Sequence, residues 1–95
     1  MDLKTFKASI DGGAPPDGLD LALQALWQDA KGDWDEAHKL AQAQEDTTGA
    51  WVHAYLHRVE GDLRNAGYWY KRADKPECTA PLAEEWDEIA AALLR

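Results

Sequence analysis

Apolar residues recur at intervals of three and four along most of the chain, which is the spacing of one face of an α-helix. The pattern predicts a short helix at residues 2–10, two helical hairpins at 17–45 and 48–74, and a final amphipathic helix at 79–94. Gly and Pro gather at 11–18 and predict a turn-rich linker, so that residues 1–16 form a short helix and its linker. We therefore expect an all-α protein with one domain.

The two hairpin segments repeat each other at an offset of 29 residues. Gly32-Asp33 aligns with Gly61-Asp62, and apolar positions coincide through both helices except at Gln44. In each Gly-Asp pair, Gly suits the left-handed end of one helix and Asp suits the cap of the next. One αα-hairpin cannot bury its apolar stripe alone, so we expect the two to stack beneath a C-terminal capping helix.

Two further helix starts are predicted from capping residues. Thr47 or Thr48 follows the polar connector and should cap the first helix of the second hairpin. Thr79 should cap the last helix, with Pro81 tolerated in its first turn.

The sequence around both Gly-Asp pairs resembles the tetratricopeptide repeat, which has Gly-Asp-aromatic-x-x-Ala at this turn. The matching strings are Gly-Asp-Trp-Asp-Glu-Ala at 32–37 and Gly-Asp-Leu-Arg-Asn-Ala at 61–66. The resemblance covers about residues 19–75, although the period of 29 is shorter than the roughly 34 residues of that family. More narrowly, the chain resembles small, uncharacterised tetratricopeptide-like proteins that carry Trp-x-His-Ala-x-x-His-Arg-x-Glu-Gly-Asp-x-x-Asn-Ala-x-Tyr-Trp-Tyr, present here at 51–70. The resemblance implies two stacked tetratricopeptide-like hairpins and no particular activity.

Charge and composition restrict the classes of partner. Ten basic and 18 acidic residues give a net charge of −8, which disfavours nucleic acid and anionic membrane as partners. Cys78 is the only cysteine, so neither an intramolecular disulfide nor a cysteine-based zinc site is expected. No apolar run has the length of a signal peptide core or a membrane span, and we expect a cytoplasmic protein. There is no Gly-rich phosphate loop and no acid–base pair, so we expect no cofactor and favour a protein that is not an enzyme, without excluding one.

His53, His57 and Glu60 share one helical face at spacing i, i+4, i+7. Two histidines one turn apart can bind one metal ion, with a carboxylate a turn further on as a third ligand. Ala54 occupies the position where zinc proteases carry a glutamate, so that chemistry is not supported. The alternative, which the sequence favours, is a polar seam between helices in which both imidazoles hydrogen-bond to neighbours.

Four residues of the second hairpin predict a binding surface for a protein or peptide. Trp51, Tyr55 and Arg58 lie on the side that lines the concave groove of a tetratricopeptide array, and Tyr68 falls opposite the apolar stripe of its helix. Arg with two aromatic rings suits a carboxylate or a stacked peptide. The alternative is that Arg58 packs over Trp51 and pairs with Glu60 or Asp62. We therefore predict a protein-interaction module acting through residues 51–70.

Two alternatives to this interaction module stay open. One is a small-molecule or metal site, possibly catalytic, built on His53, His57, Arg58 and Glu60. The other is self-association into a homodimer, because five Trp and wide apolar stripes exceed what two short hairpins readily hide.

Overall fold

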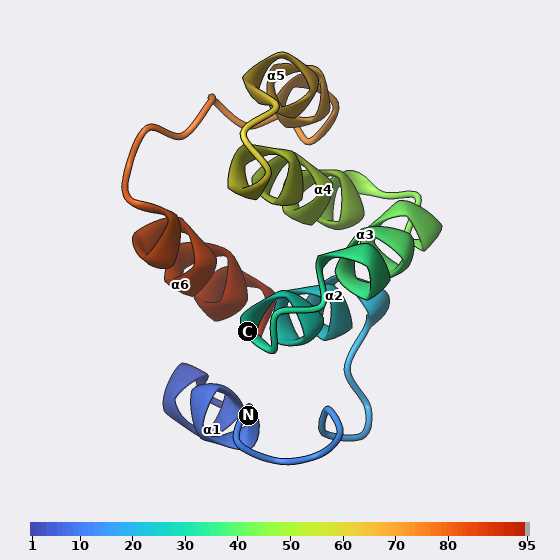
Figure 1. Cartoon of the computed structure of the whole chain (residues 1–95), viewed down its shortest axis with the longest axis vertical. Helices are drawn as coiled ribbons and strands as arrows, with labels where there is room; N and C mark the ends of the chain where they lie inside the picture. Colours follow the sequence, from blue (N-terminus) through green and yellow to red (C-terminus); the bar gives the residue numbers. More distant parts are fainter. Residues whose placement is uncertain (95) are drawn as a thin grey trace.

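A computed structural model describes residues 1–94, which contain α-helices and no strand. The all-α fold class predicted from the sequence is confirmed. The helices are α1 (Leu3–Ser9), α2 (Leu21–Ala30), α3 (Trp34–Ala43), α4 (Thr47–Val59), α5 (Leu63–Arg72) and α6 (Leu82–Leu93) (Figure 1). None of them is long and apolar enough to cross a lipid bilayer.

Helix α4 is the centre of the molecule. It packs against α2, α3, α5 and α6, and every residue from Gly49 to His57 is buried. Figure 1 shows α5 on one side of α4, with α3, α2 and α6 on the others. Because the histidine pair of the sequence lies within this buried run, the packing of α3 and α5 around α4 decides what those side chains meet.

The two Gly-Asp turns have the same structure. Gly32 and Gly61 are left-handed, with φ of 88° and 87°, a conformation that glycine adopts without strain. The backbone N–H of Asp33 donates to the carbonyl of Gln28 at 2.9 Å, and that of Asp62 donates to the carbonyl of His57 at 2.9 Å. Each Asp then caps the following helix, because its carboxylate accepts the N–H three residues on. The 29-residue repeat in the sequence is thus also a repeat in turn geometry.

Two predicted helix starts require correction. The cap of α4 is Asp46, whose carboxylate accepts the Gly49 N–H at 2.8 Å, while the Thr48 hydroxyl donates to that same carboxylate. Helix α6 begins at Leu82 with Pro81 as its N-cap and has no side-chain cap, so Thr79 does not cap it. The reason is steric, since the residue before a proline is disfavoured in the α-region and Ala80 therefore stays outside the helix.

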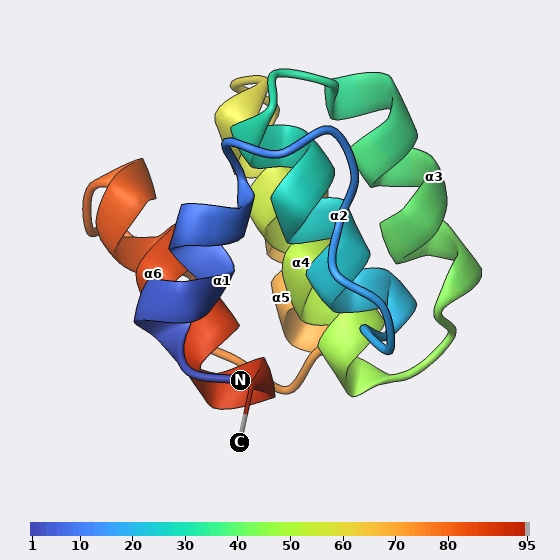
Figure 2. The same ribbon diagram turned by 90° about the horizontal axis from the view of Figure 1, so that it is seen from below.

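The first and last helices meet in the core. Helix α1 packs on α6, as Figure 2 shows, and Phe6 stacks on Trp86 with ring centroids 5.7 Å apart. The Trp86 indole N–H in turn donates to the carbonyl of Leu26 at 3.0 Å. Helix α6 thus packs on α2 and α4, and it covers a side of α4 that the predicted peptide groove would need open.

Candidate metal centre

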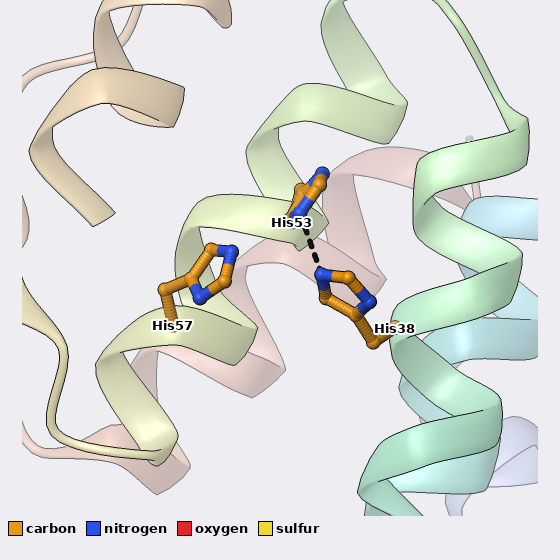
Figure 3. A group of neighbouring side chains, drawn as sticks. All are labelled: His38, His53 and His57. Carbon is orange, nitrogen blue, oxygen red and sulfur yellow. Dashed lines mark hydrogen bonds between the residues drawn. The ribbon is translucent and has the colours of Figure 1, made fainter. Parts of the chain in front are cut away.

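All three histidines of the chain gather at the seam between α3 and α4. His38 comes from α3, and His53 and His57 come from successive turns of α4. Figure 3 shows the three rings grouped together, and one nitrogen from each lies within 4.8 Å of the other two. The closest pair is His38 and His53, whose Nε2 atoms are 2.9 Å apart, so that one ring donates to the other.

The cluster is shielded from solvent, and this sets its protonation. His53 is 3% exposed and His57 is 6% exposed, while His38 is half-buried. Burial, followed by the neighbouring imidazoles of His38 and His57, lowers the pKa of His53 to about 4. Burial also lowers the pKa of His38, and His57 adds to that effect. At neutral pH, His38 and His53 are therefore neutral, which is the form that coordinates a metal.

Two tryptophans hold the rings in place. His38 stacks on Trp34 with centroids 4.9 Å apart, and the Trp34 indole N–H is anchored by a 2.8 Å bond to the carbonyl of Leu56. On the other side, His53 stacks on Trp69 at 3.8 Å with an angle of 17° between the planes. The imidazoles are thus oriented by aromatic neighbours from α3 and α5 and are not free to turn towards solvent.

Glu60 has a different position from the one that the sequence predicted. It caps the end of α4, is exposed, and holds one carboxylate oxygen 2.9 Å from Nδ1 of His57. It does not share a ligand group with His53 among the described residues, where the group containing Glu60 comprises His57 and Asp62 instead. The structure therefore groups His53 and His57 with His38 and places Glu60 at His57 alone, and both imidazoles of α4 have hydrogen-bond partners at the seam.

Sequence reasoning missed His38 because it is the only histidine of its helix and shows no spacing pattern. The available signal was topological. His38 follows Trp34 by one helical turn, and stacking of the two predicted hairpins brings α3 against α4. A histidine on the inward side of α3 then had to meet the polar face of α4.

A groove lies between α3 and α5, and His53 is one of its lining residues. Helices α3 and α5 both pack on α4, and they do not pack on each other. The space between them holds a hollow of about 600 Å³ at one end. His53 and Ala50 line it from α4, Trp69 and Arg72 line it from α5, and Gln42 lines it from α3. Of the three histidines, His53 thus lines the hollow.

The residues predicted to bind a peptide lie elsewhere, and most of them are covered. Trp51 and Tyr55 are buried, and Arg58 donates to Glu85 of α6 at 2.7 Å and also to the carbonyl of Ala80. The expectation that this side of α4 lines an open groove is corrected, because α6 folds back over it. Tyr68 is the exception, since it is exposed on α5 as expected.

The cluster offers three imidazole nitrogens, a type of ligand that transition-metal ions bind. Zinc binds histidine nitrogen at about 2.0–2.1 Å, which places tetrahedral ligands roughly 3.3 Å apart. The three nitrogens lie within 4.8 Å of one another, so the widest pair would have to close by at most about 1.5 Å to reach that spacing. Comparison of the chain with protein-family models, curated proteins and solved structures gives no match. Any function proposed for the cluster therefore depends on its geometry and on the chemistry of its side chains.

Proposed function

We propose that the protein binds one divalent transition-metal ion, of which zinc is the type, between His38, His53 and His57. The observation that carries the proposal is the convergence of every histidine of the chain at one buried seam. Imidazole nitrogen suits zinc, copper, nickel and iron, whereas magnesium and calcium prefer oxygen ligands. No carboxylate is a member of this group of three.

The hydrogen bonds around the rings support the same role. Glu60 lies at Nδ1 of His57 and favours a proton there, which leaves Nε2 of His57 unprotonated. The shared proton between His38 and His53 occupies the place where an ion would bridge their Nε2 atoms. Binding then needs a change of tautomer in one ring, from Nε2–H to Nδ1–H, and no loss of a proton from either neutral imidazole.

A metal at this position would join the two helical pairs. His38 belongs to the first pair and His53 and His57 belong to the second, so the ion would tie α3 to α4. A ligand that binds only the folded state stabilises it by about 2.7 kcal/mol at a hundred times its dissociation constant. We expect the main consequence of binding to be a more rigid and more stable arrangement of the two pairs.

Calorimetric titration of metal-free protein with Zn²⁺ tests the proposal. We expect one Zn²⁺ ion per chain. When Cu²⁺ or Ni²⁺ binds in place of Zn²⁺, it should quench the fluorescence of Trp34 and Trp69. His38→Asn should abolish binding and leave the fold intact in circular dichroism, because His38 is only half-buried. Lys39→Asn, at the next and exposed position of α3, is the matched control and should bind normally. A folded wild-type protein that binds no metal, or equal binding by the His38→Asn variant, would refute the proposal.

We also propose a second function, in which the outer face of α5 binds an acidic protein segment. Tyr68 is 54% exposed there, and Arg64, Lys71 and Arg72 make this helix basic within an acidic chain. The resemblance to tetratricopeptide proteins, supported by the two matching turns, also favours a protein partner. Large exposed apolar side chains beside cations are typical interface anchors.

Peptide selection on the intact protein tests the second function. Selected peptides should be acidic and should lose binding to Tyr68→Ala. Lys4→Ala, which removes an exposed cation from the distant α1, should retain it. Peptides that bind Tyr68→Ala as well as the wild type would contradict this role.

A further inference from the structure

The cluster supplies three nitrogen ligands and no fourth side chain within the part of the chain that the structure describes. Structural zinc sites are closed by four protein ligands, whereas sites with three keep one position for water or substrate. Resting on the metal site proposed above, we propose that the bound ion keeps an open fourth position that faces the groove between α3 and α5. A water molecule occupies it and exchanges with a small monodentate anion.

The direction of the open position follows from where the ligands come from. His53 and His57 come from α4 and His38 comes from α3 (Figure 3), and His53 lines the groove. A fourth tetrahedral position points away from all three nitrogens. The opposite side of α4 is closed by its packing on α2 and α6, so the vacant position faces the groove.

The hollow at this groove has room for a ligand. It measures about 600 Å³, and His53 is part of its lining. Trp69, which stacks on His53, forms one wall of the hollow and is half-buried, so an anion would approach the cluster beside it. A carboxylate, a bicarbonate or an azide ion is small enough to follow this path.

Charge selects an anion. Three neutral imidazoles leave the charge of a divalent ion uncompensated, and a negative ligand at the fourth position reduces it. Arg72 lines the same hollow and adds a positive charge. Two carboxylates also line it: Asp46, which is engaged by the Gly49 N–H and the Thr48 hydroxyl at the start of α4, and Glu45, which is exposed to solvent. A small anion is therefore the class of ligand that fits.

Titration of the Co²⁺-loaded full-length protein with azide tests the inference. Co²⁺ takes the place of zinc, and its visible absorption reports coordination number and ligand exchange. We expect azide to change the cobalt spectrum saturably at one site per chain. A Co²⁺ spectrum that azide does not change would overturn the open position while leaving the metal site intact. Failure of Co²⁺ and Zn²⁺ to bind at all would instead overturn the metal site and the inference with it.

A pair of variants tests whether the open position faces the groove. Gln42 and Ala43 are adjacent exposed residues of α3, but only Gln42 lines the hollow, one turn after His38. Gln42→Trp should block the groove and weaken azide binding by about tenfold or more, while Co²⁺ affinity stays within about threefold. Ala43→Trp should leave both affinities unchanged. Equal azide affinity in the two variants would show that the ligand does not enter through this groove.

Discussion

Arg58 and Glu85 form an ion pair between α4 and α6, with Nη1 of Arg58 2.7 Å from Oε1 of Glu85. The Glu85 side chain is buried, and its second oxygen accepts the hydroxyl of Tyr70 at 2.5 Å. Burial raises the pKa of Tyr70, and the Glu85 hydrogen bond and negative charge raise it further, so the phenol stays protonated and acts as a donor. One carboxylate therefore links α4, α5 and α6.

Removing this carboxylate should destabilise the protein strongly. Glu85→Ala leaves the Arg58 guanidinium and the Tyr70 hydroxyl without their partner in a covered environment, at a cost of about 3 kcal/mol. For a chain of this length that lowers the melting temperature by at least about 10 °C, measured by thermal unfolding. Glu84→Ala, at the neighbouring exposed position, should change stability by no more than about 0.5 kcal/mol. Similar melting temperatures for the two variants would mean that the ion pair contributes little.

Two helical glycines should respond oppositely to alanine. A Cβ on Gly49 would overlap the backbone carbonyl oxygen of Gln44, which cannot move away without disturbing the start of α4. Gly49→Ala should therefore cost about 3 kcal/mol or more in urea unfolding. A Cβ on Gly67 would meet only the end of the exposed Glu77 side chain, at 3.0 Å. Gly67→Ala should be neutral or stabilise by up to about 1 kcal/mol through helix propensity, and a loss as large as that of Gly49→Ala would disprove the distinction.

The parts of this fold that could be predicted from the sequence are those encoded within a few residues. Each Gly-Asp turn is specified locally, by a left-handed glycine and an N-cap carboxylate, so the positions of both turns could be predicted from the sequence. The exposure of Tyr68 followed from its place opposite the apolar stripe of α5. The start of α6 depended on the competing effect of Pro81 and was placed too early.

The parts that could not be predicted depend on contacts between distant segments. His38 contacts His53 only because α3 packs beside α4, and no residue spacing within α3 predicts this contact. The pairing of Arg58 with Glu85 spans 27 positions and covers a face that the resemblance to tetratricopeptide arrays predicted to be a groove. Gln44 breaks the apolar repeat because its side chain accepts the Ala22 N–H at 2.8 Å, a contact across the hairpin.

Asp29 should make the protein less stable at neutral pH than its amide equivalent. Burial raises the pKa of Asp29, although a hydrogen bond from Tyr55 lowers it in part. Because the folded state binds this proton more tightly than the unfolded state does, the contribution of Asp29 to stability falls as pH rises through its elevated pKa. Asp29→Asn keeps an oxygen acceptor for Tyr55 and removes the charge. It should raise the unfolding midpoint at pH 7, and the gain should shrink as pH falls towards 4. Asp35→Asn, an exposed substitution on α3, is the control, and an Asp29→Asn gain that does not depend on pH would contradict the charge-based explanation.

Glu60 should act on the metal through His57. Its carboxylate lies 2.9 Å from Nδ1 of His57 and so fixes which ring nitrogen is left for the ion. Partners of this kind typically contribute tenfold to hundredfold to metal affinity. Glu60→Gln should therefore weaken Zn²⁺ binding by about that factor in calorimetry.

The stability of the metal-free protein should change by no more than about 0.5 kcal/mol, because Glu60 is exposed. Glu84→Gln removes an exposed carboxylate from α6, away from the cluster, and corrects for the lost charge. If Glu60→Gln and Glu84→Gln bind Zn²⁺ equally, the hydrogen bond to His57 does not position a ligand. If Glu60→Gln lowers the free energy of unfolding of the metal-free protein by as much as it lowers the free energy of Zn²⁺ binding, Glu60 stabilises the fold and does not act on metal affinity.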